Sequence, residues 1–251
     1  MNLDHHLGIQ VRNGEIAEIT DAIVIEDRFR ILFNDCPVTD MIASRDQLPE
    51  LGAGFVITEG LTRCVDKVKI DGDRILVYAD RGCDVARSKK EVGSSGGTSL
   101  HAVPGKVSSD LRITPEDVFS CTRGIETEVW RKTGAVHCSV LFSEGKCVVK
   151  SSDVGRHNTV DKVVGYAILN GIDLSRCVIG CTGRQPAGMI KKDANAGIPI
   201  VISRAASTDK GIAAADAAGI TLICFSRGDR FTIYTHPERI LGAGIPGSRT
   251  K

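Results

Sequence analysis

The last third of the chain alternates short apolar segments with segments of helical spacing. The apolar segments are residues 177–181, 198–202 and 220–225, and the helical ones are 186–196 and 208–218. Apolar strands that alternate with helices are typical of βαβ units, because a parallel strand is buried on both faces and needs a crossover to reach the next. The pattern therefore predicts an α/β fold with a parallel sheet covered by helices on both faces.

The residues before these units predict further elements. Residues 114–117 combine an N-cap threonine, a proline and two acidic residues, which predicts the start of a helix that Gly134 ends. Glu144-Gly145 predicts a hairpin between strands 136–142 and 146–150. Two more elements complete this half: a helix that starts after Gly155, with Asn158 and Asp161 as a capping box, and an antiparallel strand over 231–234.

The first third of the chain is typical of short strands and turns. We expect hairpins with strands 9–12 and 15–19 around Asn13-Gly14, 23–26 and 29–33 around Asp27-Arg28, and 65–70 and 74–78 around Asp71-Gly72. Asn-Gly and Asp-Gly favour hairpins because both residues tolerate positive φ. Residues 47–58 have helical spacing. Together these elements predict a small N-terminal α+β unit.

Residues 88–109 differ in composition from the segments on either side. They are rich in serine, glycine and lysine, and residues 93–97 read Gly-Ser-Ser-Gly-Gly. This composition is typical of a flexible linker, and it also fits a mobile loop that carries a group to a site. We therefore expect an N-terminal α+β domain over 1–110, ending in this loop, and a C-terminal domain over 111–251.

The charge balance excludes several classes of partner. The chain has 251 residues and a formal net charge of +1, so it lacks the basic excess of a nucleic-acid coat. No apolar run reaches the roughly 18 residues of a membrane helix, and the first residues do not resemble a secretion signal. The 9 cysteines form no C-x-x-C pair. We expect a cytoplasmic protein with free thiols that binds neither nucleic acid nor membrane.

Each predicted parallel strand is followed by arginine. Arg184 follows the first strand, Arg204 the second, and Arg227 and Arg230 the third. The carboxyl ends of parallel strands share one edge of the sheet, where ligands bind in such folds. Guanidinium groups bind phosphate oxygens through paired hydrogen bonds, so this convergence predicts an anionic, phosphate-bearing ligand. The alternative is that these are ordinary solvated arginines at strand ends.

Two histidines are candidates for the same site. Arg156-His157 stands at a predicted helix start, a position that favours anions, so His157 is a candidate ligand contact. His137 alternates with apolar residues along a predicted strand and is either an interior histidine or a catalytic one. Trp130 is expected in the core. A zinc deaminase, a competing class for such a sheet, would need a P-C-x-x-C segment that the sequence lacks, so we expect no metal ligands.

Several segments together resemble the formate dehydrogenase accessory protein family, FdhD. Residues 153–165 read D-V-G-R-H-N-T-V-D-K-V-V-G, which is similar to the family signature D-V-G-R-H-N-x-x-D-K-x-x-G. Other segments that resemble the family are 133–137, 182–184, 196–199, 219–222, 234–237 and, upstream, 52–60. The resemblance is highly specific and covers nearly the whole chain.

The resemblance implies a fold and a function. Family members are sulfur carriers that take sulfur from a cysteine desulfurase as a persulfide. They pass it to the molybdenum bis(molybdopterin guanine dinucleotide) cofactor before insertion into the formate dehydrogenase catalytic subunit. Members are homodimers with a three-layer α/β/α C-terminal domain that is similar to cytidine deaminase without the zinc site. The resemblance places the cofactor on Phe225, Ser226, Arg227, Gly228, Asp229 and Arg230, and we expect Arg184, Arg156, His157 and His137 to complete the site.

One departure from the family concerns its sulfur-bearing loop. The family carries C-G-x-C-G there, whereas Gly93 and Gly96 stand at the two cysteine positions of this chain. Only a thiolate can hold the sulfur, so we expect either a sulfur carrier that uses another thiol or a non-catalytic protein that binds the cofactor or guanine nucleotides. Cys83, with Arg81 and Arg87 nearby, is the candidate thiol.

Overall fold

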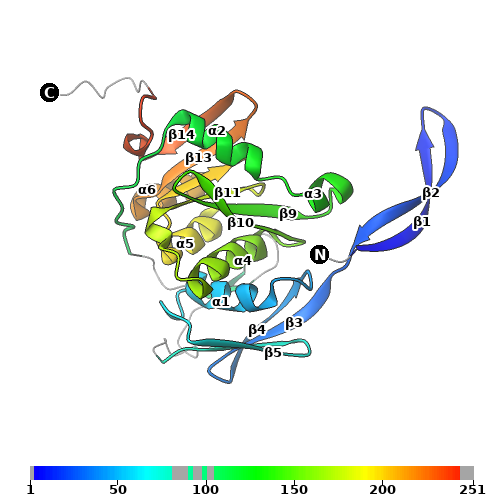
Figure 1. Ribbon diagram of the computed structural model, residues 1–251, viewed down its shortest axis with the longest axis horizontal. Coiled ribbons are helices and arrows are strands. Elements are labelled where there is room, and N and C mark those ends of the chain that lie inside the picture. The colour runs from blue at the N-terminus through cyan, green and yellow to red at the C-terminus, as the bar shows by residue number, and fades with distance from the viewer. Residues whose placement is uncertain (1–2, 81–89, 93–97, 101–104, 244–251) are drawn as a thin grey trace.

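The computed structural model describes residues 3–80, 90–92, 98–100 and 105–243 (Figure 1). Its larger sheet has the strand order β10-β9-β11-β12-β13-β14. The three central strands, β11 (Cys177–Cys181), β12 (Ile200–Ser203) and β13 (Thr221–Arg227), run parallel, which confirms the predicted βαβ units. The flanking strands are antiparallel, so the sheet is mixed: β9 (His137–Ser143), β10 (Lys146–Asp153) and β14 (Arg230–Thr235).

Helices cover both faces of this sheet. The first buried cluster joins Ile179, Val201 and Leu222 of the strands to α4 (Arg156–Leu169), α5 (Ala187–Ala196) and α6 (Asp209–Ala218). The second joins Val178, Ile202 and Ile223 to α2 (Pro115–Gly124). Successive strand residues alternate between the two clusters because their side chains point to opposite faces of the sheet. Short 3-10 helices, η2 (Leu174–Arg176) and η3 (Pro237–Arg239), lie between other elements.

The N-terminal unit is a smaller sheet covered by a helix. Its strand order is β4-β3-β6-β5, and β3 runs parallel to β6. The elements are β3 (Asp27–Phe33), β4 (Cys36–Ala43), α1 (Leu48–Thr58), β5 (Lys67–Asp71) and β6 (Arg74–Tyr78). Phe29, Ile31 and Ile75 are fully buried and belong to the same cluster as Leu51 and Phe55 of α1. The predicted α+β unit is therefore present.

The helices α1 and α4 join the two units at glycines. A Cβ on Gly54 would collide with the carbonyl oxygen of Asp161, and one on Gly165 with that of Glu50. Each glycine therefore lets the backbone of the other helix approach to contact distance. One buried cluster extends from the small sheet to the large one across this crossing. The domain boundary at 110/111 stays a prediction.

A hairpin arm precedes the small sheet. The strands β1 (Leu3–Arg12) and β2 (Glu15–Val24) pair along their whole length around Asn13-Gly14, as predicted, and both turn residues have positive φ. Figure 1 shows this arm projecting away from the rest of the protein. The predicted hairpin around Asp71-Gly72 is confirmed as β5–β6.

Several predicted elements are corrected by the structure. The hairpin around Asp27-Arg28 is wrong, because residue 23 belongs to β2 and β3 instead pairs with β4 across Asn34-Asp35, which both have positive φ. The helix that starts at Thr114 is interrupted, and α3 (Glu128–Thr133) begins anew at the Thr127 cap before the expected Gly134. The hydrogen bonds of the predicted Thr114–Asp117 capping box are present.

The structure describes three parts of the segment 88–109, and its predicted mobility stays a prediction. Its described residues include β7 (Lys90–Val92), paired with β8 (Thr98–Leu100). Val107 is buried, and its N–H donates to the carbonyl oxygen of Ala218 at 2.8 Å. The described end of this segment is thus anchored to the C-terminal unit. Among the described helices, none is both long and apolar enough to cross a membrane.

Candidate functional site

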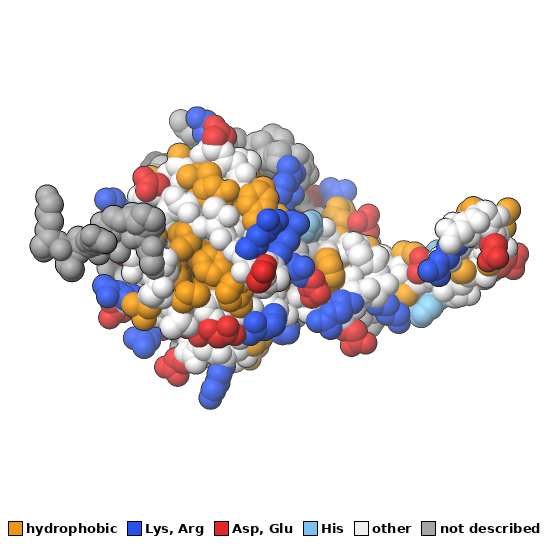
Figure 2. All heavy atoms as spheres, turned by 90° about the horizontal axis from the view of Figure 1, so that it is seen from above, with side chains coloured by type: hydrophobic (Ala, Val, Ile, Leu, Met, Phe, Trp, Pro, Cys, Tyr) orange, Lys and Arg blue, Asp and Glu red, His pale blue; other side chains and the backbone are white. Residues whose placement is uncertain are grey.

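The loops that follow the three parallel strands lie at one edge of the sheet. The parallel register pairs Cys181 with Ser203, so β11 and β12 end at the same level. Backbone hydrogen bonds join the loops: Arg204 N–H donates to Cys181 O at 3.1 Å, and Phe225 N–H donates to Ala205 O at 3.1 Å. The arginines that follow these strands therefore belong to neighbouring loops. Figure 2 shows Lys and Arg side chains gathered on the upper face of the molecule.

Arg156 begins α4 and lies against the loop after β11. A Cβ on Gly183 would lie 3.0 Å from the Cβ of Arg156, so the missing side chain of Gly183 makes room for the arginine. Burial, and then the charge of Arg184, lowers the pKa of Arg156. Its Nε is buried and has no hydrogen-bond partner among the described residues. An anion at this edge would satisfy that donor.

His137 and His157 share this environment. His137 Nδ1 lies 3.3 Å from the hydroxyl of Thr182, at the end of β11. Burial, followed by the charge of Arg156, lowers the pKa of His137. Burial, followed by the charges of Lys192 and Arg156, lowers the pKa of His157 to about 3. Both imidazoles are therefore neutral at pH 7, in a region where positive charge is already concentrated.

The loop after β12 differs because its arginine is engaged within the protein. Arg204 forms an ion pair with Glu126, and its guanidinium carbon lies 5.8 Å from the centre of the Trp130 ring. Trp130 is half-buried and packs against the second buried cluster, so its expected place in the core is confirmed in part, and Arg204 lies over its ring system. The exposed Arg227 donates from Nε to the carbonyl oxygen of Arg204 at 2.7 Å.

The predicted cofactor segment 225–230 forms the end of β13, a turn and the start of β14. Phe225 has a positive φ of 51° and a side chain that is 38% exposed, a strained backbone for a bulky residue. Ser226 is fully buried, and its hydroxyl lies 2.5 Å from that of Thr122, so it faces the protein interior. Gly228 has positive φ, and Arg227, Asp229 and Arg230 are exposed. The segment therefore presents Phe225 and two arginines outward, together with one carboxylate.

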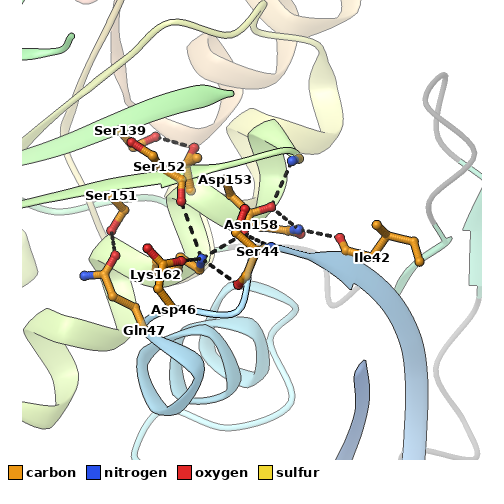
Figure 3. A network of polar contacts seen from close by, with 12 residues as sticks. Ile42, Ser44, Asp46, Gln47, Ser139, Ser151, Ser152, Asp153, Asn158 and Lys162 are labelled. Atoms are coloured by element: carbon orange, nitrogen blue, oxygen red, sulfur yellow. Dashed lines mark hydrogen bonds and ion pairs between the residues drawn. The ribbon is translucent and has the colours of Figure 1, made fainter. Parts of the chain in front are cut away.

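A buried ion network lies beneath this edge and was missed by the sequence analysis (Figure 3). Lys162 is fully buried, and its Nζ lies 2.6 Å from Asp46 and 2.8 Å from Asp153. Asp153 also accepts hydrogen bonds from the backbone of Ser44 at 3.0 Å and from Asn158 at 2.7 Å. The predicted capping box at Asn158 is therefore wrong, since its amide binds Asp153 and Ile42 O while Gly155 occupies the N-cap.

A second buried network joins α1, α4 and α5. Lys192 Nζ lies 2.7 Å from Glu59 and 2.9 Å from Asp161, and it donates to the Thr58 hydroxyl at 3.0 Å. Asp161, the other residue of the predicted capping box, is thus a buried ion-pair partner. A sequence signal was available: Asp161 and Lys162 interrupt a helix that is otherwise apolar at 160, 163 and 164.

The cysteines of the described residues divide into two groups. Cys121 and Cys181 are buried, and burial raises their pKa, so both thiols are protonated at pH 7. Cys36, Cys64 and Cys147 are exposed. Cys83, Gly93 and Gly96 lie outside the described residues. No cluster of His, Cys, Asp and Glu that could hold a metal occurs in the described part of the chain.

An apolar hollow lies beside α2 and β14. It has a volume of about 600 Å³ and is lined by Pro115, Phe119, Phe231, Thr232, Ile233, Pro237 and Ala243. Figure 2 shows hydrophobic side chains spread over this face, beside the basic cluster. The sequence analysis did not predict this hollow.

The structure is that of an α/β protein. Its mixed sheet has a basic carboxyl edge and is tied to an α+β unit by buried ion pairs. The chain belongs to the FdhD/NarQ family, whose model matches residues 24–241. It is 34% identical to the sulfur carrier protein FdhD of Methanothermobacter thermautotrophicus over 91% of this chain and 95% of that protein. It is 43% identical to the protein of the same name from Thermoplasma acidophilum, over 92% of this chain and 91% of that one.

A solved structure shares the whole fold. A protein from Desulfotalea psychrophila, described with its crystal structure as a candidate formate dehydrogenase accessory protein, is 28% identical. The match covers 95% of this chain and 99% of that chain, with a TM-score of 0.81. The resemblance to the family and the α/β class are thereby confirmed. The likeness to cytidine deaminase and the individual site residues stay predictions.

Proposed function

We propose that this chain is a sulfur carrier that serves the maturation of formate dehydrogenase. It would bind the molybdenum bis(molybdopterin guanine dinucleotide) cofactor as its substrate at the carboxyl edge of the large sheet. The names of the relatives support the sulfur-carrier role. The observation that carries the binding site is Arg156, whose buried Nε lacks a partner among the described residues while Arg184 adds charge nearby.

The chemistry of this edge suits the diphosphates of a guanine dinucleotide. Arg156, Arg184, Arg227 and Arg230 would bind phosphate oxygens, because guanidinium groups form charge-assisted hydrogen bonds with them. The start of α4 adds backbone N–H groups, and Gly155 at its N-cap has no side chain to compete for them. Neutral His137 and His157 would accept or donate hydrogen bonds without adding charge. Phe225 offers an exposed ring for a base to stack on.

Sulfur transfer at this protein would need no oxidant. A thiolate of the carrier attacks the outer sulfur of the persulfide on a cysteine desulfurase. The S–S bond of the donor breaks, its thiolate leaves, and a new S–S bond forms on the carrier. We propose Cys83 for this thiolate, since Gly93 and Gly96 offer none at the family's positions. The expected partners are therefore a cysteine desulfurase, the formate dehydrogenase catalytic subunit and a second copy of the chain, in the cytoplasm.

Calorimetry with GDP tests the binding site. Arg227→Ala and Arg184→Ala should each weaken binding about 10- to 100-fold, because each removes a charge-assisted phosphate contact worth roughly 1.5–3 kcal/mol. Arg74→Ala is the matched control, since its exposed guanidinium pairs with Asp71 in the small sheet. Unchanged affinity in both site variants would refute the assignment of the phosphate site.

Mass spectrometry of the intact protein separates the two candidate functions. After incubation with a desulfurase and cysteine, a sulfur carrier should gain the mass of one sulfur, and Cys83→Ser should abolish that gain. A non-catalytic binding protein, favoured by Gly93 and Gly96, would bind GDP and gain no sulfur. Sulfur on Cys121 or Cys181 would contradict the assignment of Cys83, because both thiols are buried.

A further inference from the structure

The N-terminal arm has one apolar face that is open to solvent. Pairing of Val11 with Ile16 and of Ile9 with Glu18 places these side chains on the same face as Leu7, because side chains alternate along each strand. Leu7 is 84% exposed, Ile9 73%, Val11 66% and Ile16 73%. The opposite face carries mostly polar residues, Asp4, His6, Gln10, Arg12, Glu15 and Asp21, together with Ala17, Ile19 and Ile23.

The other described parts of the chain leave this face exposed. In the described residues, β2 contacts α3, and Val24 at the base of the arm packs against the second buried cluster, whereas Leu7, Ile9, Val11 and Ile16 stay exposed. A two-stranded hairpin is at best marginally stable alone in water, and exposed apolar patches of this kind mark interaction surfaces. The family model matches the chain from residue 24 onward, so the arm lies before the matched region except for its last residue.

The pattern on this face is symmetric about its centre. Leu7 stands in the middle, opposite Thr20. The outermost pairs, Leu3 with Val24 and Val11 with Ile16, are apolar at both ends of the arm. Between centre and ends lie two mixed pairs, His5 with Ala22 on one side and Ile9 with Glu18 on the other. A two-fold axis through the centre would therefore place apolar pairs on apolar pairs and the His5 pair opposite the Glu18 pair.

We propose that this apolar face binds the same face of a second copy, with the two arms antiparallel. Isologous interfaces need such self-complementarity, since each patch meets its own copy. A ten-residue strand spans about 33 Å, and a two-stranded ribbon is roughly 10 Å wide, so two faces bury roughly 700 Å². A specific interface needs about 1,000 Å² or more. In this antiparallel arrangement the tip of each arm reaches the base of the arm of the second copy, near Val24, where the remaining area would be buried.

This inference rests on the homodimer proposed above and is independent of the sulfur-carrier function. Sedimentation equilibrium of the full chain tests it. The wild type should be a dimer at micromolar concentration, and Leu7→Asp combined with Ile9→Asp should raise the dimer Kd at least 100-fold. Gln10→Asp is the matched control, because Gln10 lies between Ile9 and Val11 in β1 but its side chain is on the opposite face of the arm. Thermal unfolding would check that the body of each variant stays folded.

The possible outcomes are distinct. A dimer that persists in the Leu7→Asp, Ile9→Asp variant would overturn the arm interface and leave the homodimer standing, whereas a monomeric wild type would overturn both. If the wild type is monomeric and these variants lose binding to a formate dehydrogenase subunit, the face serves that partner and the second-copy assignment is wrong. As a second measurement, a photoreactive amino acid at Val11 should cross-link to the partner at residues 3–5 or 22–24. Cross-links confined to its own chain would contradict the antiparallel arrangement.

Discussion

At the scale of single residues, the signature segment around α4 divides its side chains between two tasks. Arg156 and His157 lie toward the carboxyl edge of the sheet, where they contribute to the candidate site. Asp161 and Lys162 are buried in ion pairs with residues of the N-terminal unit or of α5. A buried charge is tolerated only when it is paired, so these two residues tie α4, the helix that begins at Arg156, to the N-terminal unit and to α5.

The burial of His157 predicts a pH dependence of stability. Its folded pKa of about 3 lies below the ordinary histidine value of 6.5. The unfolded chain therefore binds a proton that the folded chain does not, and the stability fully present above pH 6.5 is lost as the pH falls toward 3. At pH 5 the loss is about 2 kcal/mol. Urea unfolding of His157→Gln should show a smaller loss of stability between pH 7 and pH 5 than the wild type shows.

Gln10→Asn, an exposed substitution that adds and removes no titratable group, provides the control for this experiment. It should leave the difference between pH 7 and pH 5 as it is in the wild type. Equal pH dependence in His157→Gln and the wild type would show that His157 takes up its proton in the folded state, against the burial described above.

At the scale of elements, the α1–α4 crossing depends on glycine in an unusual way. Alanine normally stabilises a helix interior relative to glycine by about 1 kcal/mol. Here a Cβ at Gly54 would meet the backbone of Asp161, and backbone cannot turn aside as a flexible side chain can. The crossing brings together Glu59, Asp161 and Lys192, so it positions charged side chains as well as helices.

Gly54→Ala should therefore destabilise the protein, by about 3 kcal/mol or more, because the two helices must move apart and leave poorly packed space. Gly188→Ala on α5 is the matched control: its Cβ would lie 3.9 Å from the His157 ring, an ordinary contact, and the expected effect is neutral or stabilising. Urea unfolding measures both variants. Equal stability of the two would contradict the close backbone approach.

At the scale of the whole molecule, the two units share one buried cluster and two ion networks. Val77 of the small sheet, Val163 of α4 and Leu222 of the large sheet belong to the same cluster. Lys162 of α4 is paired with Asp46, which precedes α1. Units joined in this way unfold together, so calorimetry should give one transition.

Lys162→Met should lower the free energy of unfolding by roughly 3–5 kcal/mol, because it leaves the buried carboxylate of Asp153 without its cation. Lys67→Met, at an exposed position of β5, is the control and should change stability by less than about 0.5 kcal/mol. If Lys162→Met lowered the free energy of unfolding no more than the control does, the ion network would not contribute to the stability of the protein. Asp153→Asn in the same background should recover part of the loss.

Elements whose signals are local could be predicted from the sequence alone. The βαβ units followed from apolar runs between helical segments, and Gly197 and Gly219 end α5 and α6 with positive φ. The β1–β2 turn followed from Asn13-Gly14. The basic edge of the sheet also followed from sequence, because parallel strands end at one edge whatever their order. Local patterns suffice here since turn, cap and strand preferences act over a few residues.

Contacts between residues that lie far apart in the chain could not be predicted in this way, because they depend on how the elements pack. Residues near 46 and near 160 form one ion network, and Ser226 points inward to Thr122. Nothing in the local sequence favours these contacts, because they depend on how α1 crosses α4 and on what each sheet buries. The exposure of the apolar face of the arm was also invisible in the sequence, since alternation predicts that one face is buried but not by what.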